Sequence, residues 1–181
     1  ASYFFGAAAI TGGTVHTQRI LRSKCLQGDI RFLDILEKMG CSIIEKPDGV
    51  SITGPRKLNG ITADLGDISD TSMTLACVAA YADSPTTILN VGHIRLKESD
   101  RIATVAANLK RMGIRTKVTA DSLTIYPGTP QGAIIDSFDD HRIAMSFSMM
   151  GLVTPGVGIK GYECVSKTCP EFYALLDKLY P

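Results

Sequence analysis

The sequence lacks most of the features that would assign it quickly to a binding class. It has no excess of charge of either sign, with 19 basic and 18 acidic residues among 181. Charge therefore gives no argument for binding nucleic acid or an anionic membrane surface. The longest apolar stretches, 73–82 and 143–153, are well short of the ~20 residues that span a bilayer. No GxGxxG or Walker A motif is present, so a nucleotide-phosphate cradle is unsupported.

Histidine and paired cysteines are also scarce. The chain has three histidines and five cysteines, with no CxxC pair and no histidine at the spacing of a zinc site. Cys41 and Cys77 lie in apolar segments and are interpreted as small core residues. We therefore predict no metal ion, no cofactor and no disulfide framework, and we expect a reducing, cytoplasmic location.

What is present is the composition of a folded domain. The hydrophobic fraction is 45%, with 17 Gly and 8 Pro, which excludes disordered and collagen-like chains. We interpret residues 1–181 as one lobe without an internal boundary. The chain begins inside an apolar helical run, 1–10, with no start Met, capping residue or signal peptide. We therefore expect it to be part of a longer chain.

An internal repeat organises the sequence. Residues 36–54 and 109–128 each contain a Leu-x-x-Met-Gly step followed by two β-rich runs with a polar turn between them. Each copy predicts a helix that ends at a glycine, Gly40 or Gly113, and then a two-stranded hairpin.

The repeat extends upstream and is followed by a third, shorter copy. Each complete copy contains an apolar helix, a short strand, an amphipathic helix and the hairpin. The predicted helices are 3–10, 28–39, 73–82, 101–112, 143–152 and 170–179, and the predicted single strands are 14–20, 86–91 and 157–161. The third copy begins at 139–142 and lacks the closing hairpin. This order of elements predicts an α/β fold made of two complete units and one truncated unit.

Charged residues recur at matched helix starts. Asp70 and Asp140 precede the first helices of two copies, and lysines precede the second helices at positions Lys24, Lys97 and Lys167. In a threefold arrangement these helix starts converge, and their free N–H groups favour anions. Arg101 and Arg142 add charges with bidentate geometry. The pattern predicts a site for a multiply anionic small molecule.

A simpler interpretation of the same residues stays open. Asp70 and Asp140 are also good helix N-caps, and residues 97–101 could be a solvated helix start with Ser99 as its cap. His141 alone is typical of a structural histidine. The recurrence of these features at matched positions favours the binding site.

Two motifs carry a resemblance to a known family. Residues 96–101, Leu-Lys-Glu-Ser-Asp-Arg, and 140–145, Asp-His-Arg-Ile-Ala-Met, resemble the 5-enolpyruvylshikimate-3-phosphate synthase family. The likeness runs in order over essentially the whole chain, with supporting stretches at 1–4, 26–29, 69–74 and 166–170. It implies a monomeric enzyme of two lobes, each an inside-out α/β barrel of three βαβαββ-type units. This chain resembles the part of such an enzyme that holds its C-terminus, and the missing second lobe is its expected partner.

The resemblance also implies an activity. The family transfers the enolpyruvyl group of phosphoenolpyruvate to the 5-hydroxyl of shikimate 3-phosphate and releases phosphate, in the shikimate pathway to chorismate and the aromatic amino acids. Asp70 matches the family's base and Glu98 its acid. Arg101, Arg142 and Lys167 match the residues that hold phosphoenolpyruvate.

The same resemblance assigns the remaining site residues. Asp70, His93 and Lys97 match positions that bind shikimate 3-phosphate, although several members have Asn where His93 stands. Asp140 and His141 are expected to support the site. Glyphosate sensitivity is not predicted, because the second lobe contributes to that pocket.

Two other interpretations remain. The chain could belong to a UDP-N-acetylglucosamine enolpyruvyl transferase, which shares the fold and the reaction type. That enzyme is expected to lack the stretches at 97–101 and 139–142 and to use a loop cysteine as its acid. Alternatively, the isolated chain could be a non-catalytic lobe that binds anions, because the expected active site lies between lobes. We expect the isolated chain to be inactive.

Overall fold

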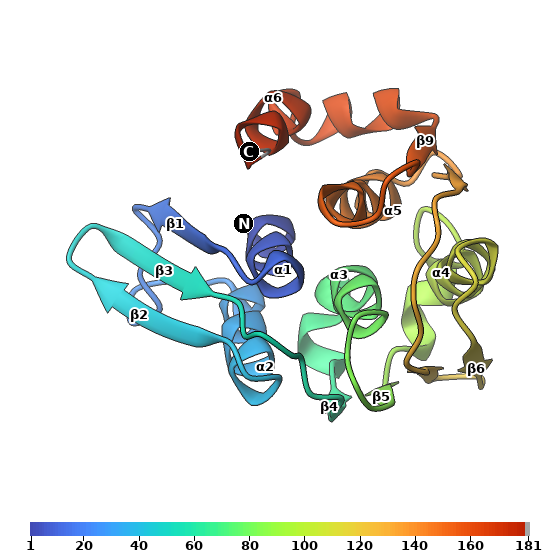
Figure 1. The fold of residues 1–181 in the computed structure, drawn as a ribbon, viewed down its shortest axis with the longest axis horizontal. Coiled ribbons are helices and arrows are strands. Elements are labelled where there is room, and N and C mark those ends of the chain that lie inside the picture. The colour runs from blue at the N-terminus through green and yellow to red at the C-terminus, as the bar shows by residue number, and fades with distance from the viewer. Residues whose placement is uncertain (180–181) are drawn as a thin grey trace.

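The computed structural model describes residues 1–179 and has alternating helices and strands (Figure 1). The helices are α1 (Ser2–Thr11), α2 (Phe32–Lys38), α3 (Ser72–Ala79), α4 (Arg101–Arg111), α5 (His141–Ser148) and α6 (Phe172–Leu176). The strands are β1 (Thr14–Gln18), β2 (Ser42–Lys46), β3 (Gly49–Thr53), β4 (Thr62–Asp64), β5 (Thr86–Leu89), β6 (Thr116–Val118), β7 (Leu123–Ile125), β8 (Ile134–Asp136) and β9 (Gly158–Lys160). The α/β class is as predicted.

The strands form three separate sheets that repeat one pattern. The middle unit has the order β4-β5-β7-β6, in which β4 and β5 are parallel and the other pairs are antiparallel. The first unit has the order β1-β3-β2, which corresponds to β5-β7-β6. The third unit has the parallel pair β8-β9, which corresponds to β4-β5. The internal repeat is therefore a structural repeat, and within residues 1–179 no strand follows β9.

Two strands were missing from the sequence interpretation. The unit identified in the sequence began with a helix, whereas β4 and β8 precede α3 and α5. Each is only three residues long and buries one residue, Ala63 or Ile135. A strand this short shows no alternation that a pattern search could detect. The complete unit is strand, helix, strand, helix, strand, strand.

The glycines predicted to end two helices do end them, but the predicted helix lengths are only partly correct. Gly40 and Gly113 have positive φ angles of 106° and 79° after α2 and α4, the left-handed conformation in which glycine ends a helix. The predicted helix 28–39 is divided, because Gly28–Arg31 is a 3₁₀ turn before α2. Likewise, α5 continues as the 3₁₀ turn Met149–Leu152.

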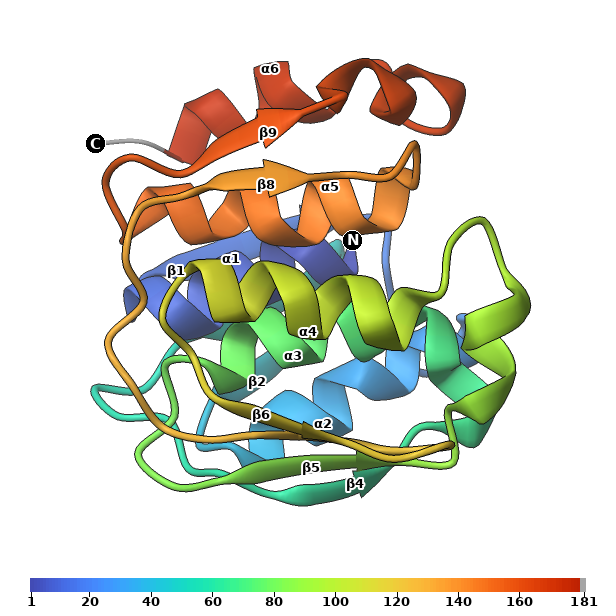
Figure 2. The ribbon, with the colours of Figure 1, turned by 90° about the vertical axis from the view of Figure 1, so that its right-hand side faces the viewer.

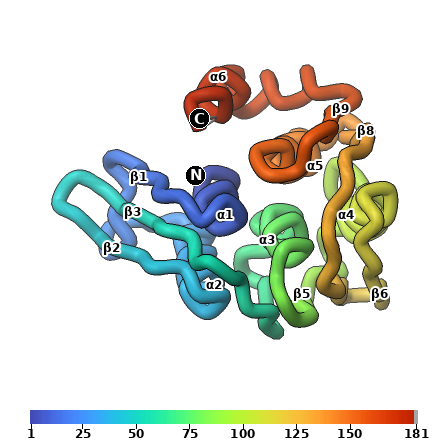
Figure 3. The backbone as a smooth tube through the Cα atoms, viewed as in Figure 1, coloured from blue at the N-terminus to red at the C-terminus, as the bar shows by residue number. Residues whose placement is uncertain are grey.

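The apolar helices α1, α3 and α5 lie together in the middle, with the sheets outside them (Figures 1 and 3). Every residue of α3 is buried. Thr74 of α3 and Ser146 of α5 share a buried hydrogen bond of 3.1 Å between their hydroxyls. A Cβ on Gly6 of α1 would come 2.7 Å from Met149 Sδ, so glycine permits the close approach of these helices. This packing explains why the three helices are apolar on most sides.

The helices begin at one end of the molecule (Figure 2). In that view β5 and β8 run toward the same end, and α4 and α5 start there and run back. The N-terminal end of α1 lies at this end too. The convergence of helix starts that the repeat predicts is therefore present.

Candidate active site

Four contacts between arginines and carboxylates lie together where the helix starts converge. Arg101, the first residue of α4, donates from Nε to Asp140 Oδ2 at 2.8 Å and from Nη1 to Asp70 Oδ1 at 3.1 Å. Its Nη2 donates to Glu98 Oε2 at 2.7 Å. Asp70 Oδ2 also pairs with Arg142 Nη2 at 2.7 Å. Two arginines therefore share carboxylates from the segments that start α3, α4 and α5.

Arg101 lies at the centre of this cluster and is almost fully buried. Its side chain is 1% exposed and that of Asp140 is 0% exposed. Burial by itself would lower the pKa of Arg101, but the surrounding carboxylates outweigh it and raise the pKa. Burial by itself would raise the pKa of Asp140, and the guanidinium with other donors holds that pKa below its ordinary value. Both groups are therefore charged at neutral pH.

Asp70 and Asp140 hold matching places in the repeat but make different contacts. Asp140 is the N-cap of α5, and its Oδ1 accepts the backbone N–H of Arg142 at 2.9 Å. The N-cap of α3 is Thr71, which makes no side-chain cap hydrogen bond. The simple capping interpretation therefore holds for Asp140 and is wrong for Asp70. The Asp70 carboxylate, which is one-third exposed, contacts two arginines instead.

The loop before α4 is fixed by its own polar residues. Asp100, and not Ser99 as the sequence suggested, caps α4 by accepting the N–H of Ala103 at 3.0 Å. Arg95 donates to both oxygens of Asp100, at 3.0 and 2.7 Å. Ser99 instead donates to Asp140 Oδ2 at 3.1 Å. The motif is thus a folded loop tied to a neighbouring helix, rather than a solvated helix start.

Other predicted residues lie at the rim of the cluster. Glu98 is 46% exposed although it pairs with Arg101. Lys97 is exposed and forms no ion pair with any residue from 1 to 179. His93 is also exposed, and its Nε2 lies 2.8 Å from Oγ of Ser69, the residue before Asp70. The roles of these three groups stay predictions.

The remaining predicted residues surround the start of α5. Lys167 Nζ donates to Asp139 Oδ2 at 2.6 Å, and this bond raises the pKa of Lys167. His141 is half-buried, and burial together with the Arg142 charge lowers the pKa of its imidazole. His141 is therefore neutral at pH 7.

A cavity beside the cluster contains residues that were not assigned as site residues from the sequence. It has a volume of about 320 Å³ and lies at the start of α1, with Arg19, Lys24 and Asp29 in its lining. Burial raises the pKa of Asp29, and the charges of Arg142 and Asp70 act on it as well. Asp29 is thus the lining residue on which charges of the arginine cluster act. The recurrence of Lys24 with Lys97 and Lys167 was the signal that pointed here.

Tyr3 of α1 borders the cluster from the same side. Burial raises the pKa of Tyr3 to about 12, although the positive charge of Arg142 acts in the opposite direction. Tyr3 is therefore a neutral hydroxyl at physiological pH. The helix starts of α1, α3, α4 and α5 all contribute to one polar region.

Metal and membrane features can be judged for the described part of the chain. Within residues 1–179 no three His, Cys, Asp or Glu side chains gather in a way that could hold a metal ion. None of the helices described there is long and apolar enough to cross a membrane. The five cysteines are free thiols.

Solved structures define the class of protein. The fold matches an EPSP synthase from Acinetobacter baumannii with a TM-score of 0.86 and 32% identity, over 98% of this chain and 44% of that one. It also matches the enolpyruvyl transferase NikO from Streptomyces tendae, with a TM-score of 0.79 and 22% identity, over 98% of this chain and 41% of that one. The fold is that of the enolpyruvyl transferases.

The sequence comparisons then give the family. The model of the EPSP synthase (3-phosphoshikimate 1-carboxyvinyltransferase) family matches residues 1–176, and the chain belongs to this family. It is 47% identical over 173 residues to the 3-phosphoshikimate 1-carboxyvinyltransferase of Nostoc punctiforme, covering 96% of this chain and 40% of that protein. The relative from Methanosphaerula palustris is 47% identical over 176 residues, 97% of this chain and 41% of that protein. The chain thus spans about two-fifths of the length of these relatives.

These findings confirm the resemblance drawn from the two motifs. They favour the EPSP synthase family over the UDP-N-acetylglucosamine enolpyruvyl transferase alternative. They do not assign roles to individual residues, so those roles remain proposals.

Proposed function

We propose that this chain is part of a 3-phosphoshikimate 1-carboxyvinyltransferase and supplies about half of its active site. The proposed enzyme moves the enolpyruvyl group of phosphoenolpyruvate to the 5-hydroxyl of shikimate 3-phosphate and releases phosphate. The observation that carries this proposal is the contact of Arg101 and Arg142 with Asp70 and Glu98 at converging helix starts. This contact supports the proposal because cations suited to an anionic substrate lie beside two carboxylates there.

The chemistry divides between these groups. Asp70 takes the proton of the attacking hydroxyl, and Glu98 gives a proton to the methylene carbon of phosphoenolpyruvate and later removes one. General acid–base help of this kind contributes about 10²–10⁴ in rate. Arg101, Arg142 and Lys167 hold the negative charges of phosphoenolpyruvate. Preorganised cations stabilise developing charge best where water is excluded, which requires a second lobe to close over this surface.

The contacts of the free chain show which exchange substrate binding would require. The outer nitrogens of Arg101 are taken by Asp70 and Glu98, and Arg142 also pairs with Asp70. A substrate carboxylate that took the donors now bonded to Asp70 and Glu98 would replace those carboxylates. The same exchange would release Asp70 and Glu98 for proton transfer. In that exchange, substrate binding is coupled to release of the base.

Arg142→Lys is expected to raise the KM for phosphoenolpyruvate about 10-fold or more in the full-length enzyme. Lysine keeps the positive charge but loses the planar pair of donors that matches a carboxylate. Arg142 is 24% exposed, so the substitution leaves the buried contacts of Arg101 in place. Steady-state kinetics with each substrate varied in turn measure the effect. An unchanged KM for phosphoenolpyruvate would exclude Arg142 from the clamp.

The activity itself is tested by measuring phosphate release from phosphoenolpyruvate. The assay compares this chain alone with the chain joined to the rest of its parent protein, each with and without shikimate 3-phosphate. We expect activity only from the joined protein and only with shikimate 3-phosphate. Activity with UDP-N-acetylglucosamine instead would favour the other enolpyruvyl transferase. If the joined protein binds both anions without releasing phosphate, the non-catalytic interpretation is correct.

A further inference from the structure

Asp140 makes more contacts than a helix cap requires. Its Oδ2 accepts hydrogen bonds from Arg101 Nε at 2.8 Å and from Ser99 Oγ at 3.1 Å. Its Oδ1 accepts the backbone N–H of Arg142 at 2.9 Å and Arg101 Nη2 at 3.4 Å. A capping aspartate needs only the bond to the helix N–H. The other three bonds tie Asp140 to α4 and to the loop before it.

The two contacts with Arg101 determine which edge of the guanidinium is available. Asp140 occupies the inner edge, formed by Nε and Nη2. The outer edge, formed by Nη1 and Nη2, points toward Asp70 and Glu98. Because the guanidinium is planar and rigid, holding its inner edge fixes the direction of its outer edge. The carboxylates on the outer edge are partly exposed, whereas Asp140 is not exposed at all.

The backbone immediately before Asp140 has an unusual conformation. Phe138 and Asp139, immediately before it, have φ angles of 52° and 56°, a left-handed conformation that aspartate tolerates but that is unfavourable for a bulky residue such as phenylalanine. This turn leads from β8 into α5 and aims the Asp140 side chain inward. Asp140 then accepts the backbone N–H of Arg142, the second residue of α5.

Resting on the proposed function, we propose that Asp140 is a positioning residue that sets the outer edge of Arg101 and the first turn of α5, so that Arg101 and Arg142 present their donors to one substrate carboxylate. Asp140 does not contact substrate. Its effect reaches the substrate through the two arginines, and it therefore affects phosphoenolpyruvate more than the second substrate.

The kinetic test uses the full-length protein that contains this chain. Asp140→Asn is expected to raise the KM for phosphoenolpyruvate about 10- to 100-fold, the effect of losing a charged hydrogen bond. The KM for shikimate 3-phosphate is expected to stay within about twofold. Asp140→Glu keeps the charge and is expected to recover part of the loss. Asp83→Asn is the matched control, because Asp83 is exposed and, within residues 1–179, its side chain bonds only to Ser84.

A second variant guards against misfolding of Asp140→Asn. Ser99→Ala removes one of the four bonds to Asp140 and leaves the ion pair, so a smaller rise of about 2- to 5-fold in the same KM is expected. Equal rises in the KM for both substrates would show general damage and overturn the proposal. An unchanged KM for phosphoenolpyruvate in both variants would overturn it as well.

A measurement that does not depend on enzyme activity separates this proposal from the proposed function. The Nε–H of a guanidinium held at its inner edge exchanges slowly with water and gives a distinct NMR signal. We expect this signal for Arg101 in the wild type and its loss in Asp140→Asn, with the Asp83→Asn spectrum unchanged. A wild-type protein that is inactive but keeps this signal, with the signal lost in Asp140→Asn, would reject the proposed function and retain the positioning of Arg101. A signal that survives Asp140→Asn would reject the positioning itself.

Discussion

Asp70→Asn is expected to reduce kcat of the full-length enzyme by about 10²–10⁴-fold while leaving the KM for phosphoenolpyruvate unchanged or lower. The asparagine side chain cannot take a proton from the attacking hydroxyl at neutral pH, so the chemical step slows. At the same time Arg101 and Arg142 lose the carboxylate that pairs with both in the free chain. Their outer donors are then more available to substrate, and binding does not weaken. The expected signature is a fall in kcat without a rise in KM.

Asp67→Asn is the matched control for this result. Asp67 lies three residues before Asp70, is strongly exposed and pairs at 3.4 Å with Arg31, away from the arginine cluster. It should leave both constants within about twofold of wild type, as is usual for exposed sites. If Asp70→Asn raised the KM and spared kcat, Asp70 would be a structural partner of the arginines and not the base. Single-turnover measurements of phosphate formation make the same distinction, because the slow release of products does not affect them.

Much of the fold could be predicted because the chain repeats itself. The matching Met-Gly steps at Gly40 and Gly113 fixed two helix ends and the hairpins after them. The short strands β4 and β8 could not be found in this way, since each offers only three residues and one buried side chain. Their existence depends on pairing with β5 and β9, which are distant in the sequence. The local sequence pattern is therefore enough to predict the longer helices and hairpins, whereas the three-residue strands form only through their pairing with distant strands.

The position of the candidate site could be predicted from the sequence, but the hydrogen bonds and ion pairs between its side chains could not. The repeat placed Asp70 and Asp140 at equivalent helix starts, and helix starts were expected to converge. It could not reveal that one carboxylate is buried under Arg101 while the other remains partly exposed. That difference arises from the loop before α4, where Ser99 turns toward Asp140 instead of capping its own helix. The two aspartates therefore differ because of tertiary contacts, which the sequence repeat does not contain.

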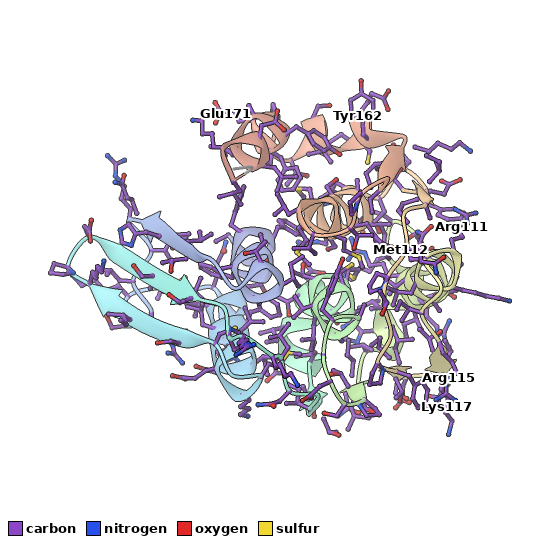
Figure 4. The ribbon with its side chains drawn as sticks, viewed as in Figure 1. Arg111, Met112, Arg115, Lys117, Tyr162 and Glu171 are labelled. Atoms are coloured by element: carbon purple, nitrogen blue, oxygen red, sulfur yellow. The ribbon has the colours of Figure 1, made fainter. Side chains whose placement is uncertain are left out.

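Arg101→Met is expected to destabilise the protein strongly at neutral pH. Methionine fills a similar volume but supplies no cation, so the fully buried Asp140 loses its partner. Removing one member of a buried ion pair typically costs about 3–5 kcal/mol, because the remaining charge is left without compensation. Arg111→Met is the control, since Arg111 lies on the same helix, is exposed and lies at the periphery of the molecule (Figure 4). Thermal and urea unfolding of the full-length protein measure the difference.

The pH dependence of that variant tests the cause of the instability. In the wild type the folded pKa of Asp140 is depressed, so its contribution is present above the ordinary aspartate pKa of about 3.9 and is lost as pH falls through the lower folded pKa. Without Arg101, burial dominates and raises the folded pKa above the ordinary value. The folded variant then binds more protons than the unfolded one between those two pKa values, and acidification from pH 7 stabilises it. The stability difference between wild type and Arg101→Met should therefore shrink as the pH is lowered toward 4, whereas the difference for Arg111→Met should stay constant. A gap that did not change with pH would mean that lost packing, and not the uncompensated Asp140 charge, destabilises the variant.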